Sequence, residues 1–204
     1  MKTNKIYLSV FFIFLFNIIG ATALCFPALR EAILKLTPLN LLLIFMIFFY
    51  ANNDFSLSFL KTILLVFIIG YFIEVLGVRF KFIFGEYFYG ETLGLKILNT
   101  PIIMGINWLS LSLSTFGIAA YVFKPKLLIV VAASALMVLT DMLIEPLSAS
   151  LDFWYWKNSV IPTQNYIAWF LVSLIIHSII LKSDIKLNPV LCFALLGSQI
   201  LFFT

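Results

Sequence analysis

Long apolar runs constrain this chain more than any other feature. Hydrophobic residues make up 63% of the 204 residues and charged residues 11%, a composition far from that of a soluble domain. Five runs have about the 20 residues that an α-helix needs to cross the hydrocarbon core of a bilayer. These five are residues 6–24, 58–78, 101–122, 127–147 and 165–182, and two shorter runs are 38–51 and 189–203. The sequence therefore predicts an all-α polytopic membrane protein, a bundle of about seven transmembrane helices, with residues 1–204 forming one integral domain of the cell membrane.

The first apolar run also has features of a secretory signal peptide. Lys2 and Lys5 precede it, and it ends in Ala21-Thr22-Ala23, where small residues stand at the positions of a cleavage site. A retained first helix and a cleaved leader are therefore both consistent with this segment.

Charge and cysteine content exclude other classes of function. The net charge of +4 is spread over loop ends without a basic run, so no nucleic-acid partner is expected. Cys25 and Cys192 lack the spacing of a metal site or a redox pair. The basic residues are divided almost evenly between the two predicted sides of the membrane, so as a whole they predict no orientation. If the basic residues within 79–96 are left out of the count, the remainder favours a cytoplasmic N-terminus.

Three carboxylates lie within the predicted spans. Glu74 is near the end of the third span, and Asp141 and Glu145 are one turn apart on one face near the end of the fifth. Because a charged group costs several kcal/mol inside a bilayer, such residues mark functional sites. The third and fifth spans run in the same direction, so we expect these carboxylates at one membrane face, pointing inward. The starts of the fourth and sixth spans bring further candidates for substrate contact to this face: Asn107, Trp108, Asn165, Tyr166 and Trp169.

Two aromatic loops close the same predicted face. The first is FGEYFYG at 84–90 and the second is DFWYWKN at 152–158. An interfacial belt would place Trp and Tyr at both membrane faces, whereas all four Trp of this chain fall on one face. A structural alternative for the carboxylates is that they pair with Arg79 or Lys81. The loops add four candidates for substrate contact, Tyr87, Tyr89, Trp154 and Trp156, and one carboxylate, Glu86, which either handles water or a proton or faces solvent.

Buried carboxylates among aromatic rings suit acid chemistry on a hydrocarbon. A carbon–carbon double bond is a weak base, so it needs a carboxylic acid that stays protonated near neutral pH. Burial and a second nearby carboxylate both favour the protonated form of such an acid. The carbocation that results is stabilised by aromatic faces, by about 0.5–2 kcal/mol per ring.

Roles can be assigned from depth and spacing. Asp141 is deeper than Glu145, so we expect Asp141 to be the general acid and Glu145 to tune it. Either Glu74 or Glu86 would orient the attacking water, through Asn107 or Asn165. The sequence has no motif for a metal, nucleotide or flavin, so no cofactor and no metal are expected.

Five segments together resemble a known family. They are GEYFYG followed by LG at 93–94, TPIIMGINW at 100–108, TDMLIEP at 140–146, WYW at 154–156 and IPTQNYIAWF at 161–170. From Glu74 to Phe170 the chain is similar to the carotenoid biosynthesis membrane proteins of the CruF type, the carotenoid 1,2-hydratases. The resemblance implies addition of water to the terminal isopropylidene double bond of an acyclic carotenoid end group, without a redox cofactor. It also implies a carotenoid substrate in the lipid bilayer and allows other carotenoid biosynthesis enzymes as partners. Glu145 stands where Asp is more usual, which leaves the substrate open.

Three other functions use similar residues. A lycopene-type cyclase begins with the same protonation but excludes water. A UbiA-type prenyltransferase needs two Asp-rich motifs that hold magnesium, and this chain has one Asp–Glu pair. A transporter or scaffold would also bury carboxylates, but transporters usually break their helices at mid-membrane, whereas these polar residues lie near one end.

Overall fold

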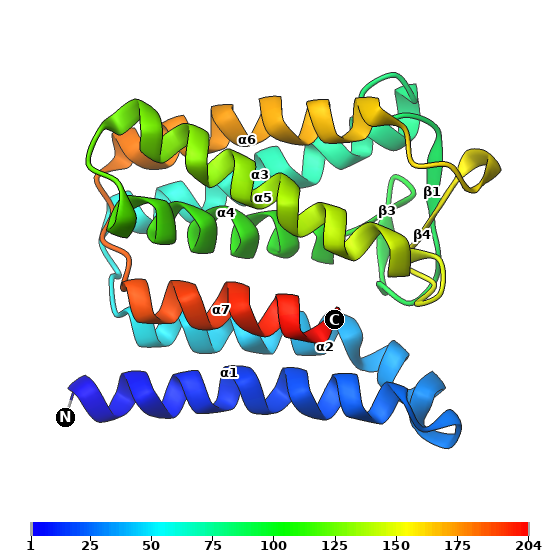
Figure 1. The fold of residues 1–204 in the computed structure, drawn as a ribbon, viewed down its shortest axis with the longest axis horizontal. Helices are drawn as coiled ribbons and strands as arrows, with labels where there is room; N and C mark the ends of the chain where they lie inside the picture. The colour runs from blue at the N-terminus through cyan, green and yellow to red at the C-terminus, as the bar shows by residue number, and fades with distance from the viewer. Residues whose placement is uncertain (1, 204) are drawn as a thin grey trace.

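The computed structural model describes residues 2–203, which form seven α-helices and four short strands (Figure 1). The helices are α1 (Lys2–Leu24), α2 (Pro27–Asn52), α3 (Leu57–Phe80), α4 (Ile103–Val122), α5 (Lys126–Ser148), α6 (Thr163–Ser183) and α7 (Pro189–Phe202). The first six are long and apolar enough to cross a membrane. Helix α7 has 14 residues, so its length of about 21 Å is less than the hydrocarbon core. The protein is a multi-pass, all-α membrane bundle, as predicted.

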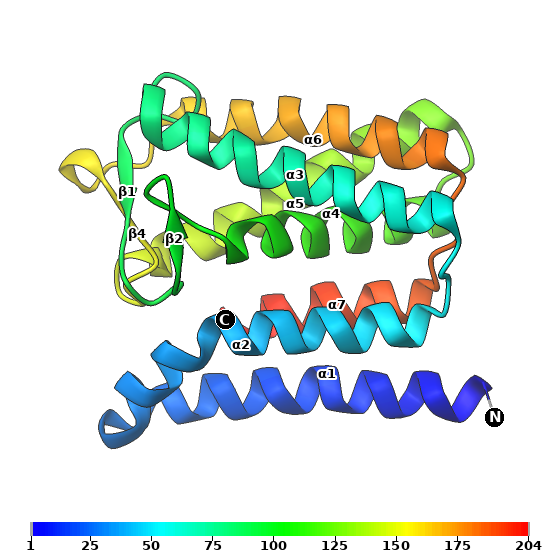
Figure 2. The same ribbon diagram turned by 180° about the vertical axis from the view of Figure 1, so that it is seen from behind.

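Helix α2 is longer than the sequence predicted. It begins at Pro27 rather than at residue 38, because Pro27 occupies the first turn, where the missing N–H has no intrahelical partner to lose. Pro38 lies inside the helix and cannot donate to the carbonyl of Leu34. Figure 2 shows that the first part of α2 is inclined to the rest, and proline is the usual cause of such a bend.

The helices are arranged in layers. Helices α3, α4, α5 and α6 lie together, α2 and α7 lie beside them, and α1 is outermost (Figures 1 and 2). Helix α4 is central, since it contacts α2, α3, α5, α6 and α7. A Cβ atom on Gly70 would lie 2.3 Å from the Cβ of Trp108, so a glycine is needed where α3 and α4 approach each other.

His177 ties three helices together away from the carboxylates. Its Nε2 is 3.1 Å from Thr115 Oγ1 of α4, and its Nδ1 is 2.9 Å from Ser134 Oγ of α5. Both ring nitrogens therefore have a hydroxyl partner, which is what a fully buried histidine requires.

The two aromatic loops form a small sheet across one end of the bundle. Strand β1 (Tyr87–Tyr89) pairs antiparallel with β4 (Trp154–Trp156), with Tyr87 opposite Trp156 and Tyr89 opposite Trp154. Strands β2 (Lys96–Ile97) and β3 (Thr100–Pro101) form a second pair between α3 and α4, and a short 3-10 helix, η1 (Lys157–Ser159), follows β4. We call residues 84–90 and 152–158 the aromatic lid.

Candidate active site

Strand alternation decides which rings of the lid face the bundle. Successive side chains of a strand point to opposite faces. The rings of Phe88 and Tyr155 stack on the outer face with centroids 5.2 Å apart, and Phe88 is 60% exposed. The four buried rings on the inner face are those of Tyr87, Tyr89, Trp154 and Trp156. The lid therefore presents two phenol hydroxyls and two indole N–H groups to the bundle.

Asp152 holds the lid loops together. Its carboxylate accepts hydrogen bonds from the backbone N–H of Glu91 (2.9 Å), from the backbone N–H of Thr92 (3.1 Å) and from the Tyr155 hydroxyl (2.8 Å). Burial alone would raise the pKa of Asp152, but these hydrogen bonds outweigh it and lower the pKa. Sequence analysis assigned no role to this anchor, although its position as the first residue of the second aromatic segment was a signal.

Glu74 is a buried carboxylate with three protein donors. It accepts hydrogen bonds from the hydroxyls of Tyr87 (2.5 Å) and Tyr89 (2.7 Å) and from Trp108 Nε1 (2.8 Å). Burial, followed by the charge of Glu74, raises the pKa of both tyrosines well above the usual value, so their hydroxyls remain protonated donors. Hydrogen bonds to a carboxylate are stronger than those between neutral groups, so Glu74 fixes β1 to α3 and α4.

Glu145 and Asp141 share one amide but differ in their other partners. Asn165 Nδ2 donates to Asp141 Oδ2 (3.0 Å) and to Glu145 Oε1 (3.1 Å). The other oxygen of Glu145 accepts from the indole N–H groups of Trp154 (3.0 Å) and Trp156 (2.7 Å). Among residues 2–203, Asp141 Oδ1 receives no hydrogen bond. Glu145 thus has three donors and Asp141 one.

A small cavity of about 20 Å³ lies between these carboxyl groups. Its polar lining is Glu74, Asp141, Glu145 and Asn165, and its other walls are Phe84, Tyr87, Tyr89, Met104, Trp154, Trp156 and Trp169. A cavity needs about 10–15 Å³ and two to four polar partners to hold one water. The space therefore suits one water molecule in contact with three acids.

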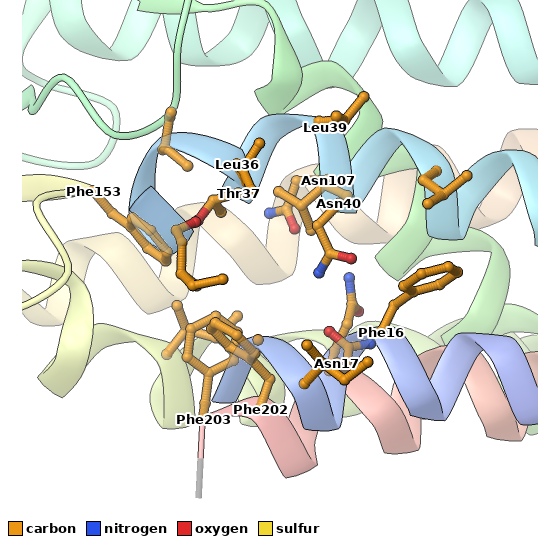
Figure 3. Close-up of a pocket in the computed structure, with 18 of the residues that line it drawn as sticks. Phe16, Asn17, Leu36, Thr37, Leu39, Asn40, Asn107, Phe153, Phe202 and Phe203 are labelled. Atoms are coloured by element: carbon orange, nitrogen blue, oxygen red, sulfur yellow. The ribbon is translucent and has the colours of Figure 1, made fainter. Parts of the chain in front are cut away.

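A larger, mostly apolar cavity of about 220 Å³ (Figure 3) shares lining residues with the small one. Residues of α1, α2, α4, α5 and α7 line it, together with the loops at Leu93 and Phe153. Met104 and Trp154 line both cavities and so form the wall between them. Sequence analysis missed three residues of α1, α2 and α7 whose side-chain amides line this cavity: Asn17, Asn40 and Gln199. The signal in the sequence was that each is a polar amide within an otherwise apolar run.

Not every candidate from the sequence reaches the carboxyl cluster. Asn107 lines the larger cavity rather than the small one. Tyr166 is half-buried and lines neither. Trp108 donates to Glu74 and stacks on Trp169 with ring centroids 4.1 Å apart, so Trp108 supports a ring that lines the small cavity without lining it itself.

Glu86 lies outside the cluster. Its two oxygens form ion pairs with Lys81 (2.6 Å) and Lys157 (2.7 Å), and its side chain is 38% exposed. Hydrogen bonds from Lys157 and Lys81 lower the pKa of Glu86 to about 2, so it is ionised. The structure therefore does not bring Glu86 to the water or proton that the sequence interpretation assigned to it; two nearby lysines hold it on the outside of the lid.

Comparison with known families adds a classification to this geometry. Residues 12–190 match the model of a family described as carotenoid biosynthesis protein. The chain belongs to the carotenoid biosynthesis protein family. The match extends beyond the resemblance over residues 74–170 and includes α2 and most of α1. Comparisons with curated proteins and with solved structures gave no significant match.

Membership of the carotenoid biosynthesis family fits the two cavities. The large cavity lies among membrane helices, and its walls from α2 fall within the matched residues, as does Asn17 of α1. In the described part of the chain, no three His, Cys, Asp or Glu side chains are grouped as ligands of a metal ion. The carboxyl groups instead accept hydrogen bonds from Trp, Tyr and Asn side chains. Membrane-spanning helices and mostly apolar walls fit a carotenoid substrate that is dissolved in the lipid.

Proposed function

We propose that this carotenoid biosynthesis protein is a carotenoid hydratase. It adds water to the terminal isopropylidene double bond of an acyclic carotenoid end group and gives a tertiary alcohol. One observation carries the proposal: a space for one water, bounded by three carboxyl groups, shares the wall of Met104 and Trp154 with an apolar cavity. The proposal requires residues 1–204 to work as one membrane domain, because the two cavities draw on α1 to α7.

Asp141 is the general acid. It has a single hydrogen-bond donor, whereas Glu74 and Glu145 have three each, so Asp141 is the carboxyl that its surroundings stabilise least as an anion. Asp141 transfers its proton to the terminal CH carbon of the double bond. The positive charge then forms on the carbon that bears two methyl groups, because a tertiary cation is the more stable one.

The surroundings stabilise this cation without trapping it. The rings of Trp154, Trp156 and Trp169 line the small cavity, and indole rings attract positive charge over their faces without offering a nucleophile. Glu145 supplies the negative charge of a carboxylate, and its two indole N–H donors hold it in place. Tyr87 and Tyr89 hold Glu74, which lines the same cavity, in place.

Water completes the reaction and restores the acid. The water oxygen forms a bond to the tertiary carbon, and one of its protons passes to the Asp141–Glu145 pair. The pair ends the cycle with the proton that it held at the start, so no net acid is consumed. Asn165 touches both members of the pair and orients the water between them.

The test is expression in a bacterium that accumulates lycopene or a monocyclic carotene, followed by chromatography and mass spectrometry of the pigments. The expected product is heavier by one water and keeps its visible spectrum, because the terminal double bond lies outside the conjugated chain. A product of unchanged mass would identify a cyclase instead. No change in several acyclic carotenoids would refute an enzymatic role on this end group.

A further inference from the structure

The larger cavity has the size of a chain end rather than of a whole carotenoid. Pockets that enclose a drug-sized molecule have about 300–1,000 Å³, and this one has about 220 Å³. A linear polyene would therefore place only its last isoprene units inside, and the remainder would stay in lipid. The cavity is open on the side where its lining residues are exposed: Ile19 is 50% exposed, Leu36 51% and Leu39 60%.

The shape of α2 creates this opening. Pro38 bends the helix within the stretch that lines the cavity, between Leu36 and Asn40. Gly94, which has a positive φ of 79°, packs against the bend, since a Cβ atom there would lie 3.1 Å from Pro38 Cγ. The bend is thus a supported feature of the wall.

The cavity also contains amides that no protein group satisfies. Gln199 is 5% exposed, and its Oε1 has no hydrogen-bond partner among the described residues. The side chains of Asn40 and Asn107 likewise form no hydrogen bond within residues 2–203. Figure 3 shows the amides of Asn40 and Asn107 in one part of the cavity, beside that of Asn17, which donates to Ser198 Oγ at 2.9 Å. The rings of Phe153, Phe202 and Phe203 lie in another part. An unpaired amide in an apolar site costs free energy, so these groups suit a ligand that carries one hydroxyl.

We propose that this cavity binds the end of the isoprenoid chain, which enters from the bilayer past Ile19, Leu36 and Leu39, and that the amides of Asn40, Asn107 and Gln199 bind the hydroxyl of the tertiary alcohol. The inference rests on the proposed hydration, which supplies that alcohol. The alkene end needs no amide and moves on to the acids by displacing Met104, a flexible side chain that can adopt other rotamers. The alcohol then moves back into the larger cavity, where Asn107 lies one helical turn from Met104 on α4, before it leaves the protein.

Pigment binding tests the cavity without relying on turnover. Purified protein in lipid nanodiscs, with Asp141→Asn as the background to prevent conversion, is incubated with lycopene, and the pigment retained above empty nanodiscs is measured by absorbance. Leu36→Trp and Leu39→Trp each place a large ring at the opening, and we expect about tenfold weaker retention. Leu42→Trp is the matched control, because Leu42 is exposed on the same helix but does not line the cavity. Equal retention by all three variants would overturn the binding site.

A second comparison tests the amides. Asn40→Leu should weaken retention of the singly hydrated alcohol about fivefold, the value of roughly one neutral hydrogen bond, and leave lycopene retention unchanged. Asn4→Leu is the control, since Asn4 is exposed at the far end of α1. Loss of both pigments, or of neither, would overturn the assignment of the hydroxyl. If the cavity variants lose binding but the natural protein makes no alcohol in cells, the hydratase proposal fails while the binding site stands.

Discussion

Replacing Asp141 by Asn separates chemistry from folding at this site. The side-chain oxygen of Asn can still accept the hydrogen bond that Asn165 Nδ2 gives to Asp141 Oδ2 at 3.0 Å. The new amide N–H can donate toward Glu145, which faces the same Asn165 group. The variant therefore keeps the packing and polar contacts of the pair, and its free energy of unfolding should change by less than about 1 kcal/mol. What it loses is the proton that the reaction needs.

The expected loss of activity follows from the role of a general acid. Such groups contribute about 10²- to 10⁴-fold to a rate, which corresponds to about 3–5 kcal/mol of the barrier. We expect Asp141→Asn to form hydrated carotenoid at least about 100-fold more slowly in membranes that contain equal amounts of protein. Product is measured by chromatography at several times, and protein by quantitative blotting.

Glu74→Gln is the matched control, since it also removes a buried carboxylate of the same cavity. Glu74 uses one oxygen for Tyr87 and Tyr89 and the other for Trp108. A glutamine has one oxygen. If its NH₂ group faces Trp108, two donors meet; if it faces Tyr87 and Tyr89, the phenol oxygens can accept from it but their own protons lose the acceptor. We therefore expect a stability loss of about 1–3 kcal/mol. The two variants should thus differ in kind: Asp141→Asn loses activity with near-normal thermal stability, and Glu74→Gln loses stability first. An Asp141→Asn protein with more than half the normal rate would refute its role as the acid.

Three further variants test other parts of the structure. Trp156→Phe removes the 2.7 Å hydrogen bond to Glu145 but keeps a ring in the lid, so it should lower the free energy of unfolding by about 1–3 kcal/mol. Phe88→Tyr on the exposed outer face removes no hydrogen bond and is the control. An equal fall in melting temperature for both variants would contradict the importance of the Trp156 bond. Glu86→Gln should leave the hydration rate unchanged, and a loss of activity would return Glu86 to the catalytic residues. The pKa of Glu86 is lowered to about 2, so its ion pairs contribute fully to the stability of the lid at pH values above the ordinary carboxyl pKa of about 4.3. This contribution is lost as the pH falls towards 2. Protease cleavage of the lid should therefore rise over this pH range in the natural protein, and should rise less in Glu86→Gln. Gly70→Ala places a Cβ 2.3 Å from that of Trp108 and should lower the melting temperature markedly, whereas Gly197→Ala, whose nearest neighbour would be 3.7 Å away, should not.

The helices could be predicted from the sequence because their cause is local. Each long apolar run became a helix with ends within a few residues of the prediction, since the bilayer requires every backbone group to be satisfied within its own segment. Helix α2 was the exception. Its first turns contain Arg30, Glu31 and Lys35, which lower the hydropathy at one end of a helix that nevertheless continues. Arg30 donates to the carbonyl of Ser150 at 2.8 Å, so this polar end has a tertiary partner that hydropathy does not detect.

Most of the candidate residues of α3, α5, α6 and the two lid loops line the small cavity, because the predicted directions of the spans bring these segments to one membrane face. The i, i+4 spacing placed Asp141 and Glu145 on one face, and both line the small cavity. The pairing of β1 with β4 depends on residues more than sixty positions apart, and segments of three residues are too short for their alternation to identify a strand. The ion pair of Glu86 with Lys157 and the position of Asn107 in the larger cavity also depend on contacts between distant parts of the chain. Tertiary packing decides which of several polar residues near one membrane face point to the same space.

The division of polar residues between the two cavities follows from the cost of burying them. The ionisable groups Glu74, Asp141 and Glu145 lie where the lid, α4 and α6 supply hydrogen-bond donors, because an unsatisfied charge at this depth would destabilise the fold. The neutral amides lie in the cavity that opens to lipid, where an unpaired group costs less than a charge would. Helix α4 belongs to both regions, because Trp108 donates to Glu74 while its neighbour Asn107 and Met104 line the large cavity. Met104 and Trp154 line both cavities, so little more than these two side chains separates the large cavity from the acids. If the proposed hydrocarbon end binds in the large cavity, substrate selection would occur at that wall.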